Sequence, residues 1–223
     1  MRRRLQHDIA KLKKNILGLS ALVEDRLREA VKSIVERDPD RAQQVIDGDA
    51  EIDQMEVDLE EECLKTLALH QPVAIDLRQV IAILKLNNDL ERIGDLSVNI
   101  AESAISLSRR RVIPIPIDVT TMCIKVQSML RKVLDALVNL DGDLALEICK
   151  ADDEVDAYHR QIYEIVRDGI MQYPDRVDCM LEALDVTGCL ERIADHCTNI
   201  AEDIIYLIDG EIIRHKGPKN NMI

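Results

Sequence analysis

The chain has 223 residues, of which 47% are hydrophobic and only 2% aromatic, and it carries a formal net charge of −13. This acidic balance excludes a general nucleic-acid-binding protein, which needs a basic footprint. Few glycines and prolines, with abundant Leu, Glu, Asp, Arg and Ala, predict an all-α fold with an aliphatic core.

Hydrophobic residues recur with the helical period along nearly the whole chain, and this predicts six long helices. The first three cover about 5–37, 40–70 and 75–108. Pro114 and Pro116 exclude a helix around them, so residues 111–118 are predicted to form an extended linker. A fourth helix then runs to about 140, a fifth from a turn at 141–143 to about 172, and a sixth from a turn at 173–175 to about 209. Gly210 is the expected residue after the last helix, and a frayed tail is expected over 211–223.

Two segments repeat the same sequence about a hundred residues apart. Residues 90–102 read LERIGDLSVNIAE and residues 190–202 read LERIADHCTNIAE, so nine of thirteen positions are identical. Upstream, segment 49–53 matches segment 152–156 at an offset of 103 residues. A repeat broken only by a difference in loop length indicates two copies of one structural unit. Short connections make consecutive helices antiparallel neighbours, so we predict two tandem three-helix bundles, 1–110 and 119–210, related by internal duplication.

The repeated polar positions share one face of each helix, because at about 100° per residue they lie within roughly 80° of one another. In the two copies they are Glu91, Asp95, Asn99 and Glu102, and Glu191, Asp195, Asn199 and Glu202. The antiparallel preceding helix places further carboxylates at the same height, namely Asp49 and Asp53 in the first copy and Asp152 and Asp156 in the second. Oxygen donors converging from two helices suit hard or borderline cations. The sequence therefore predicts one metal site in each repeat.

Two other interpretations of these residues remain open. The acidic faces can be solvated, with Arg92 and Arg192 as counterions, and the protein would then be a helical adaptor without metal. A ferritin-like di-iron oxidase needs Glu-x-x-His on two helices, and the nearest approach is Asp156-Ala-Tyr-His159, whose first-copy counterpart ends in Glu56.

His196 points about 100° away from Asp195 and is expected at the rim of the site. No Ser-His-Asp order, glycine-rich phosphate loop or nucleophilic cysteine context is present, so an enzyme is not expected.

Compartment and surface follow from the remaining features. The six cysteines lie within helical patterns without a C-x-x-C pair, which is typical of buried thiols in a reducing compartment. A continuous apolar run of roughly 18 residues is missing, so we expect no transmembrane helix or signal peptide and a cytoplasmic protein. The N-terminal basic cluster is typical of a solvated helix start, with contact to anionic lipid or a partner as the alternative. Its members are Arg2, Arg3, Arg4, Lys11, Lys13 and Lys14.

These motifs resemble the PhoU family of phosphate-signalling proteins, whose two three-helix repeats each carry a Glu/Asp-x-x-x-Asp motif on the third helix. The matching segments are 89–102 and 190–202, and the turn at 71–78 (QPVAIDLR) is also similar to the family's first-repeat turn. The second turn is shorter and lacks the Leu-Arg of the first, which leaves a role of the turns in partner contact unequal between the halves. The resemblance extends over about 5–209.

The resemblance implies a cytoplasmic, usually dimeric regulator of phosphate uptake and the phosphate-starvation response. Such proteins act between the ATPase of a phosphate ABC transporter and a sensor histidine kinase. It also implies multinuclear iron or zinc clusters, one per repeat, bound by Glu91, Asp95, Glu191 and Asp195 and by the other acidic and amide residues named above. Carboxylate and amide oxygens would accept Mg or Mn equally well, so the residue types do not choose the metal. Contact with a membrane is then expected only through partners.

Overall fold

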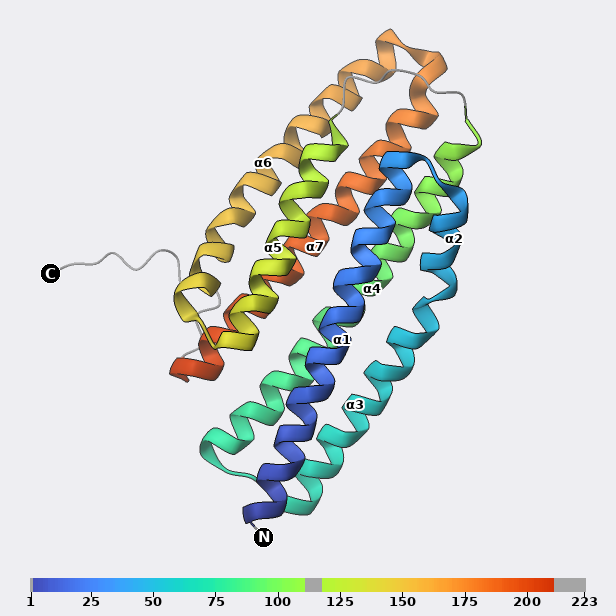
Figure 1. Cartoon of the computed structure of the whole chain (residues 1–223). Coiled ribbons are helices and arrows are strands. Elements are labelled where there is room, and N and C mark those ends of the chain that lie inside the picture. The colour runs from blue at the N-terminus through green and yellow to red at the C-terminus, as the bar shows by residue number, and fades with distance from the viewer. Residues whose placement is uncertain (1, 111–117, 211–223) are drawn as a thin grey trace, which may run out of the picture.

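The structure is a computed structural model that describes residues 2–110 and 118–210, and helices make up almost all of both ranges (Figure 1). The first repeat consists of α1 (Arg2–Glu36), α2 (Pro39–Asp47), α3 (Asp49–His70) and α4 (Ala74–Ser108). The second consists of α5 (Val119–Asn139), α6 (Gly142–Gln172), a 3-10 turn η1 (Pro174–Arg176) and α7 (Val177–Asp209). The prediction of an all-α fold built from two repeats is confirmed.

Side-chain caps start α2, α5 and α6, and left-handed residues end α3, α5 and α7. Asp38, Asp118 and Asp141 accept backbone N–H hydrogen bonds at the starts of α2, α5 and α6. Gly210 ends α7 in the left-handed conformation predicted from the sequence, with φ of 75°. Apart from Asp118, the predicted linker 111–118 and the predicted frayed tail 211–223 lie outside the described residues.

The single helix predicted over 40–70 is wrong at one point, because it is interrupted at Gly48, between α2 and α3. A Cβ atom at Gly48 would lie 2.3 Å from the Cζ atom of Arg26 in α1. The guanidinium therefore occupies the space that any other residue would fill at this position. The same guanidinium pairs with Glu51 at 3.3 Å, in the first turn of α3. Glycine here lets α1 hold the junction between the two helices.

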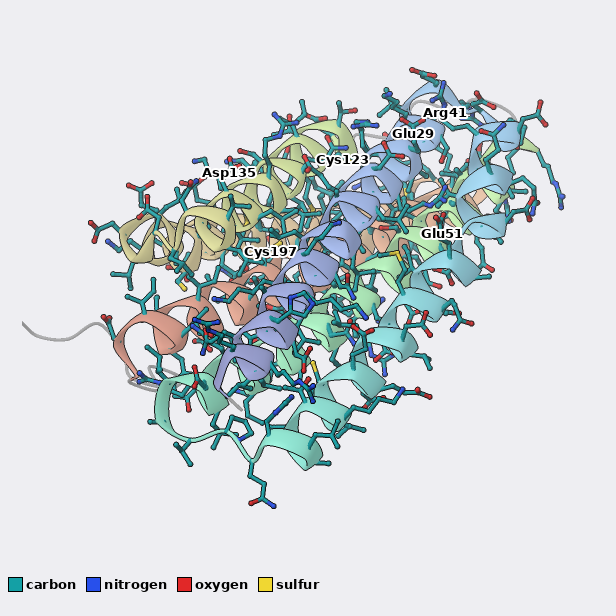
Figure 2. All side chains as sticks on the ribbon, turned by 60° about the horizontal axis from the view of Figure 1, so that its bottom comes forward. Glu29, Arg41, Glu51, Cys123, Asp135 and Cys197 are labelled. Carbon is teal, nitrogen blue, oxygen red and sulfur yellow. The ribbon has the colours of Figure 1, made fainter. Side chains whose placement is uncertain are left out.

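Charges also fix the junction of α1 and α2. Figure 2 shows Glu29 and Arg41 side by side, and the Arg41 guanidinium donates to the Glu29 carboxylate. Hydrogen bonds from Lys32 and Arg41 lower the pKa of Glu29 to about 2, against the opposing effect of burial. This carboxylate therefore stays ionised throughout the physiological pH range.

The two repeats pack against each other through α4 and α7, which run antiparallel (Figure 1). The end of α4 meets the start of α7, where Arg110 contacts Asp178 at 2.6 Å. Further along, Lys85 Nζ lies 3.0 Å from the buried carboxylate of Asp203. The turn between α3 and α4 and the equivalent turn between α6 and α7 consequently lie at opposite ends of the molecule.

One hydrophobic core runs through both repeats. It includes Leu90 and Ile93 of the first repeat and the equivalent Leu190 and Ile193 of the second, all four fully buried. Five of the six cysteines are buried, as the sequence predicts, and Cys149 is partly exposed. Among the described helices, none combines the length and apolar character that crossing a bilayer requires.

Candidate metal centres

The first acidic cluster lies between α3 and α4. Asp49, Asp53 and Asp95 each place one carboxylate oxygen within 4.8 Å of the other two. Glu91, one turn before Asp95, is close enough for the negative charge of Asp95 to raise the pKa of its carboxyl. The antiparallel arrangement of α3 and α4 thus gathers four carboxylates from two helices, at the height that the loop lengths indicate.

Burial is the largest cause of the raised pKa values in this cluster. It raises the pKa of Asp49, with Asp53 and Asp95 contributing next, and it raises the pKa of Glu91. Arg92 contacts Asp95 at 3.0 Å and Glu91 at 3.5 Å, as a counterion would. However, the Arg92 side chain is 55% exposed, and a solvated ion pair of this kind stabilises little. The charge of Arg26 also lowers the pKa of Asp49, yet burial and the neighbouring carboxylates outweigh it and keep that pKa raised.

The second acidic cluster lies between α6 and α7 and is more deeply buried at one position. Burial raises the pKa of Asp152 to about 7, and the charges of Asp195 and Asp156 contribute further. Burial and Asp156 also raise the pKa of Asp195, and burial and Asp195 raise the pKa of Glu191. Oδ1 of Asp152 is buried and accepts no hydrogen bond from the residues that the structure describes. Such an oxygen is costly to bury without a partner.

Glu56 lies beside the first cluster and His159 beside the second, and neither is among the predicted ligands. They occupy the same position in the two repeats, three residues after Asp53 and Asp156. Burial, Glu60 and Asp53 raise the pKa of Glu56, and the charge of His159 lowers the pKa of Glu191. Nδ1 of His159 is buried without a hydrogen-bond partner among the described residues. The signal that identifies both residues is their i+3 spacing from the acidic motif.

Four predicted ligands lie farther along α4 and α7. Asn99 and Glu102 are exposed, and Asn199 donates to Oδ1 of Asp89 across the boundary between the repeats, at 3.4 Å. Glu202 is half-buried, and its charge adds to burial in raising the pKa of the Cys149 thiol. Their role as ligands stays a prediction. His196, expected at the rim, places Nδ1 2.8 Å from the same oxygen of Asp89.

The donor set of both clusters fits hard or borderline cations. Carboxylates dominate both of them, with one imidazole in the second, and such donors bind iron, zinc, manganese and magnesium. The buried, unpartnered oxygen of Asp152 and nitrogen of His159 are the groups that a bound cation would satisfy. A cation would also offset the mutual repulsion that, after burial, contributes to the raised pKa values.

Comparison with known proteins agrees with the fold and its duplication. The family model described as the PhoU domain matches twice, over residues 16–104 and 119–204. A phosphate-specific transport system accessory protein PhoU homologue from Pseudomonas putida is 37% identical over 95% of this chain and 83% of that protein. The crystal structure of PhoU from Pseudomonas aeruginosa is 36% identical, covers 92% of this chain and 99% of its own, and superposes with a TM-score of 0.90. The regulatory protein PhoU from Streptococcus pneumoniae superposes with a TM-score of 0.83 at 29% identity, over 93% of this chain and 98% of its own. The chain therefore belongs to the PhoU family.

Proposed function

We propose that this protein is a non-enzymatic, cytoplasmic regulator of phosphate uptake and of the phosphate-starvation response. The relatives named as accessory proteins of the phosphate-specific transport system support this role, because they match nearly the whole chain. The partners are then the ATPase of a phosphate ABC transporter, a sensor histidine kinase, or both, and the protein itself is a homodimer. A net charge of −13 suits rapid, salt-sensitive docking on basic partner surfaces.

The same proposal includes one multinuclear Fe or Zn cluster in each repeat, with Mg or Mn as alternatives. In the first repeat, Asp49, Asp53, Glu91 and Asp95 would hold it, with Glu56 beside them. In the second, the ligands would be Asp152, Asp156, Glu191 and Asp195, with His159 beside them. A bound cluster supplies positive charge that neutralises the carboxylates and ties the two helices of each site together. The observation that carries the proposal is the convergence of three carboxylate oxygens in the first repeat, with partly buried, mutually repelling carboxylates at the equivalent place in the second.

The regulatory role is tested by a pull-down with the tagged full-length protein from cells grown at high and at low phosphate. We expect transporter or kinase subunits to be retained in amounts that depend on phosphate, and mass spectrometry identifies them. Retention of neither class of protein under either condition would contradict the role in phosphate signalling.

The metal site is tested by elemental analysis of the purified protein and of a variant carrying Asp95→Ala and Asp195→Ala. We expect several Fe or Zn ions per chain in the parent and a large loss in the variant. Circular dichroism should show little change in helicity, because both side chains lie off the core. A matched control carries Asp58→Ala and Asp135→Ala, at exposed positions outside the clusters. Equal metal content in parent and variant would contradict the assignment of these ligands.

A further inference from the structure

One end of the molecule combines exposed aliphatic side chains with unpaired positive charge. We call it the basic end, and it consists of residues 2–14 at the start of α1 and residues 61–78 around the turn between α3 and α4 (Figure 1). Three contacts hold these segments together: His70 lies 2.8 Å from Asp8, Gln6 donates to Asp76 at 2.9 Å, and Lys11 pairs with Glu62. The basic end is therefore one continuous surface.

The turn between α3 and α4 holds large aliphatic side chains out into solvent. Leu69 is 70% exposed, Val73 74% and Ile75 54%. Gln71 and Ala74 on either side of Val73 adopt left-handed backbone conformations, with φ of 44° and 52°. Gln71 is the left-handed C-cap of α3, whereas Ala74 begins α4 in a conformation that is unfavourable for a residue other than glycine. The exposed side chains of this turn do not contribute to the core.

The charge of the basic end is opposite to that of the rest of the protein. It contains eight Lys and Arg residues against four Asp and Glu residues, whereas the whole chain has a net charge of −13. Two of the four acidic side chains form ion pairs, Glu61 with Lys65 and Glu62 with Lys11, and the carboxylates of Asp8 and Asp76 contact the side chains of His70 and Gln6. Arg3, Arg4, Lys13 and Lys14 are exposed, and within the described ranges none of them forms an ion pair. The positive charge is thus available to an anionic partner.

We propose that the basic end docks directly on an anionic phospholipid membrane. Leu69, Val73 and Ile75 would enter the headgroup region, while the exposed Lys and Arg residues of α1 contact lipid phosphates. A bilayer interface offers apolar depth and negative charge side by side, which this combination of side chains matches. The strongly acidic remainder is repelled by the same surface, so the protein would stand on the membrane by this end. This inference does not depend on the metal clusters and adds a lipid surface to the protein partners proposed above.

The proposal is tested by co-sedimentation of the full-length protein with vesicles of phosphatidylcholine alone or of phosphatidylcholine with phosphatidylglycerol. We expect binding only to the anionic vesicles, decreasing as salt is raised. Lys13→Gln with Lys14→Gln should weaken binding about 25-fold, since each basic residue near an anionic surface contributes about fivefold. Val73→Ser with Ile75→Ser should weaken it about tenfold. Both pairs of substitutions fall on exposed positions, and Ser at position 73 is a favourable helix N-cap for α4.

Matched controls carry the same chemical changes elsewhere. Lys132→Gln with Lys150→Gln removes two exposed charges from α5 and α6, and Met171→Ser removes an exposed apolar side chain from the end of α6. Both control variants should bind anionic vesicles like the parent. Equal sedimentation with the two kinds of vesicle, or undiminished sedimentation of the basic-end variants, would overturn the proposal. Binding only to vesicles that carry transporter protein would also overturn it, by assigning the surface to a protein partner. None of these outcomes affects the results expected for metal content or for the pull-down, so this proposal can fail independently of the proposed function.

Discussion

Metal-free protein carrying Asp152→Asn is expected to be more stable at neutral pH than the metal-free parent, by about 2 kcal/mol. The folded state raises the pKa of Asp152 from 3.8 to about 7, mainly through burial. At a pH between these two pKa values, Asp152 is deprotonated in the unfolded chain and protonated in the folded chain. The free energy of unfolding of the parent therefore falls as pH rises through this range. The full shift corresponds to about 4 kcal/mol, and partial exposure of the carboxylate reduces this to about 2. Asparagine stays neutral and avoids the penalty.

The measurement is urea unfolding from pH 4 to pH 8 in the presence of a chelator. The difference between variant and parent should be near zero at the acid end and reach its full value above the folded-state pKa. Asp135→Asn, at an exposed position on α5, is the matched control and should show no such trend (Figure 2). Added iron or zinc should reverse the order, because the variant lacks one of the proposed ligand oxygens. A pH-independent difference between metal-free variant and parent would contradict the assigned cause.

Helices α3 and α4 approach each other closely beside the first acidic cluster. A Cβ atom at Gly94 would lie 3.2 Å from two side-chain carbons of Ile52 and 3.8 Å from Oδ1 of Asp49. The equivalent residues of the second repeat are Val155 and Ala194. Compared with Ile52 and Gly94, the first residue has one carbon fewer and the second has one carbon more. Gly94→Ala alone should cost about 1 kcal/mol, because overpacking exceeds the gain in helix propensity. Ile52→Val alone should also cost about 1 kcal/mol, for the lost methylene.

The double variant reproduces the packing of the second repeat, so the two costs should not add. We expect a coupling free energy of about 1–2 kcal/mol in a double-mutant cycle measured by chemical denaturation. Gly18→Ala is the matched control, because its Cβ atom would meet only Met55 Cε at an ordinary 3.7 Å. Combined with Ile52→Val, it should give additive effects. Additivity of Gly94→Ala and Ile52→Val would instead show that the two helices can move apart at this point.

The sequence was sufficient for the features that depend on local pattern. Helical periodicity and the positions of the prolines predict the helices to within a few residues, and the internal repeat predicts the duplication. The register of neighbouring helices follows from short turns, and it brings Asp49 and Asp53 to Asp95. The break at Gly48 was not predicted, and the Arg26 guanidinium that packs against it belongs to another helix, which local pattern does not reveal.

Features that depend on packing between the repeats were beyond the sequence pattern. Asn199 repeats Asn99, yet it faces Asp89 of the other repeat, while Asn99 is exposed. Likewise, His196 follows the acidic motif directly in sequence but contacts Asp89. Both arrangements result from the antiparallel packing of α4 and α7, which neither repeat encodes alone. A helical wheel of one repeat therefore cannot distinguish residues of the acidic clusters from residues of the boundary between repeats.

Because the repeats pack antiparallel, the two ends of the molecule differ from each other. Helices α4 and α7 have 35 and 33 residues, which at about 1.5 Å per residue gives a rod of roughly 50 Å. The end opposite the basic end carries Met171, which at 86% exposure is the most exposed large apolar side chain there. A protein bound to a bilayer by its basic end would hold the opposite end about 50 Å away, in the aqueous phase. There, a second protein could be engaged without competing with lipid for the same surface.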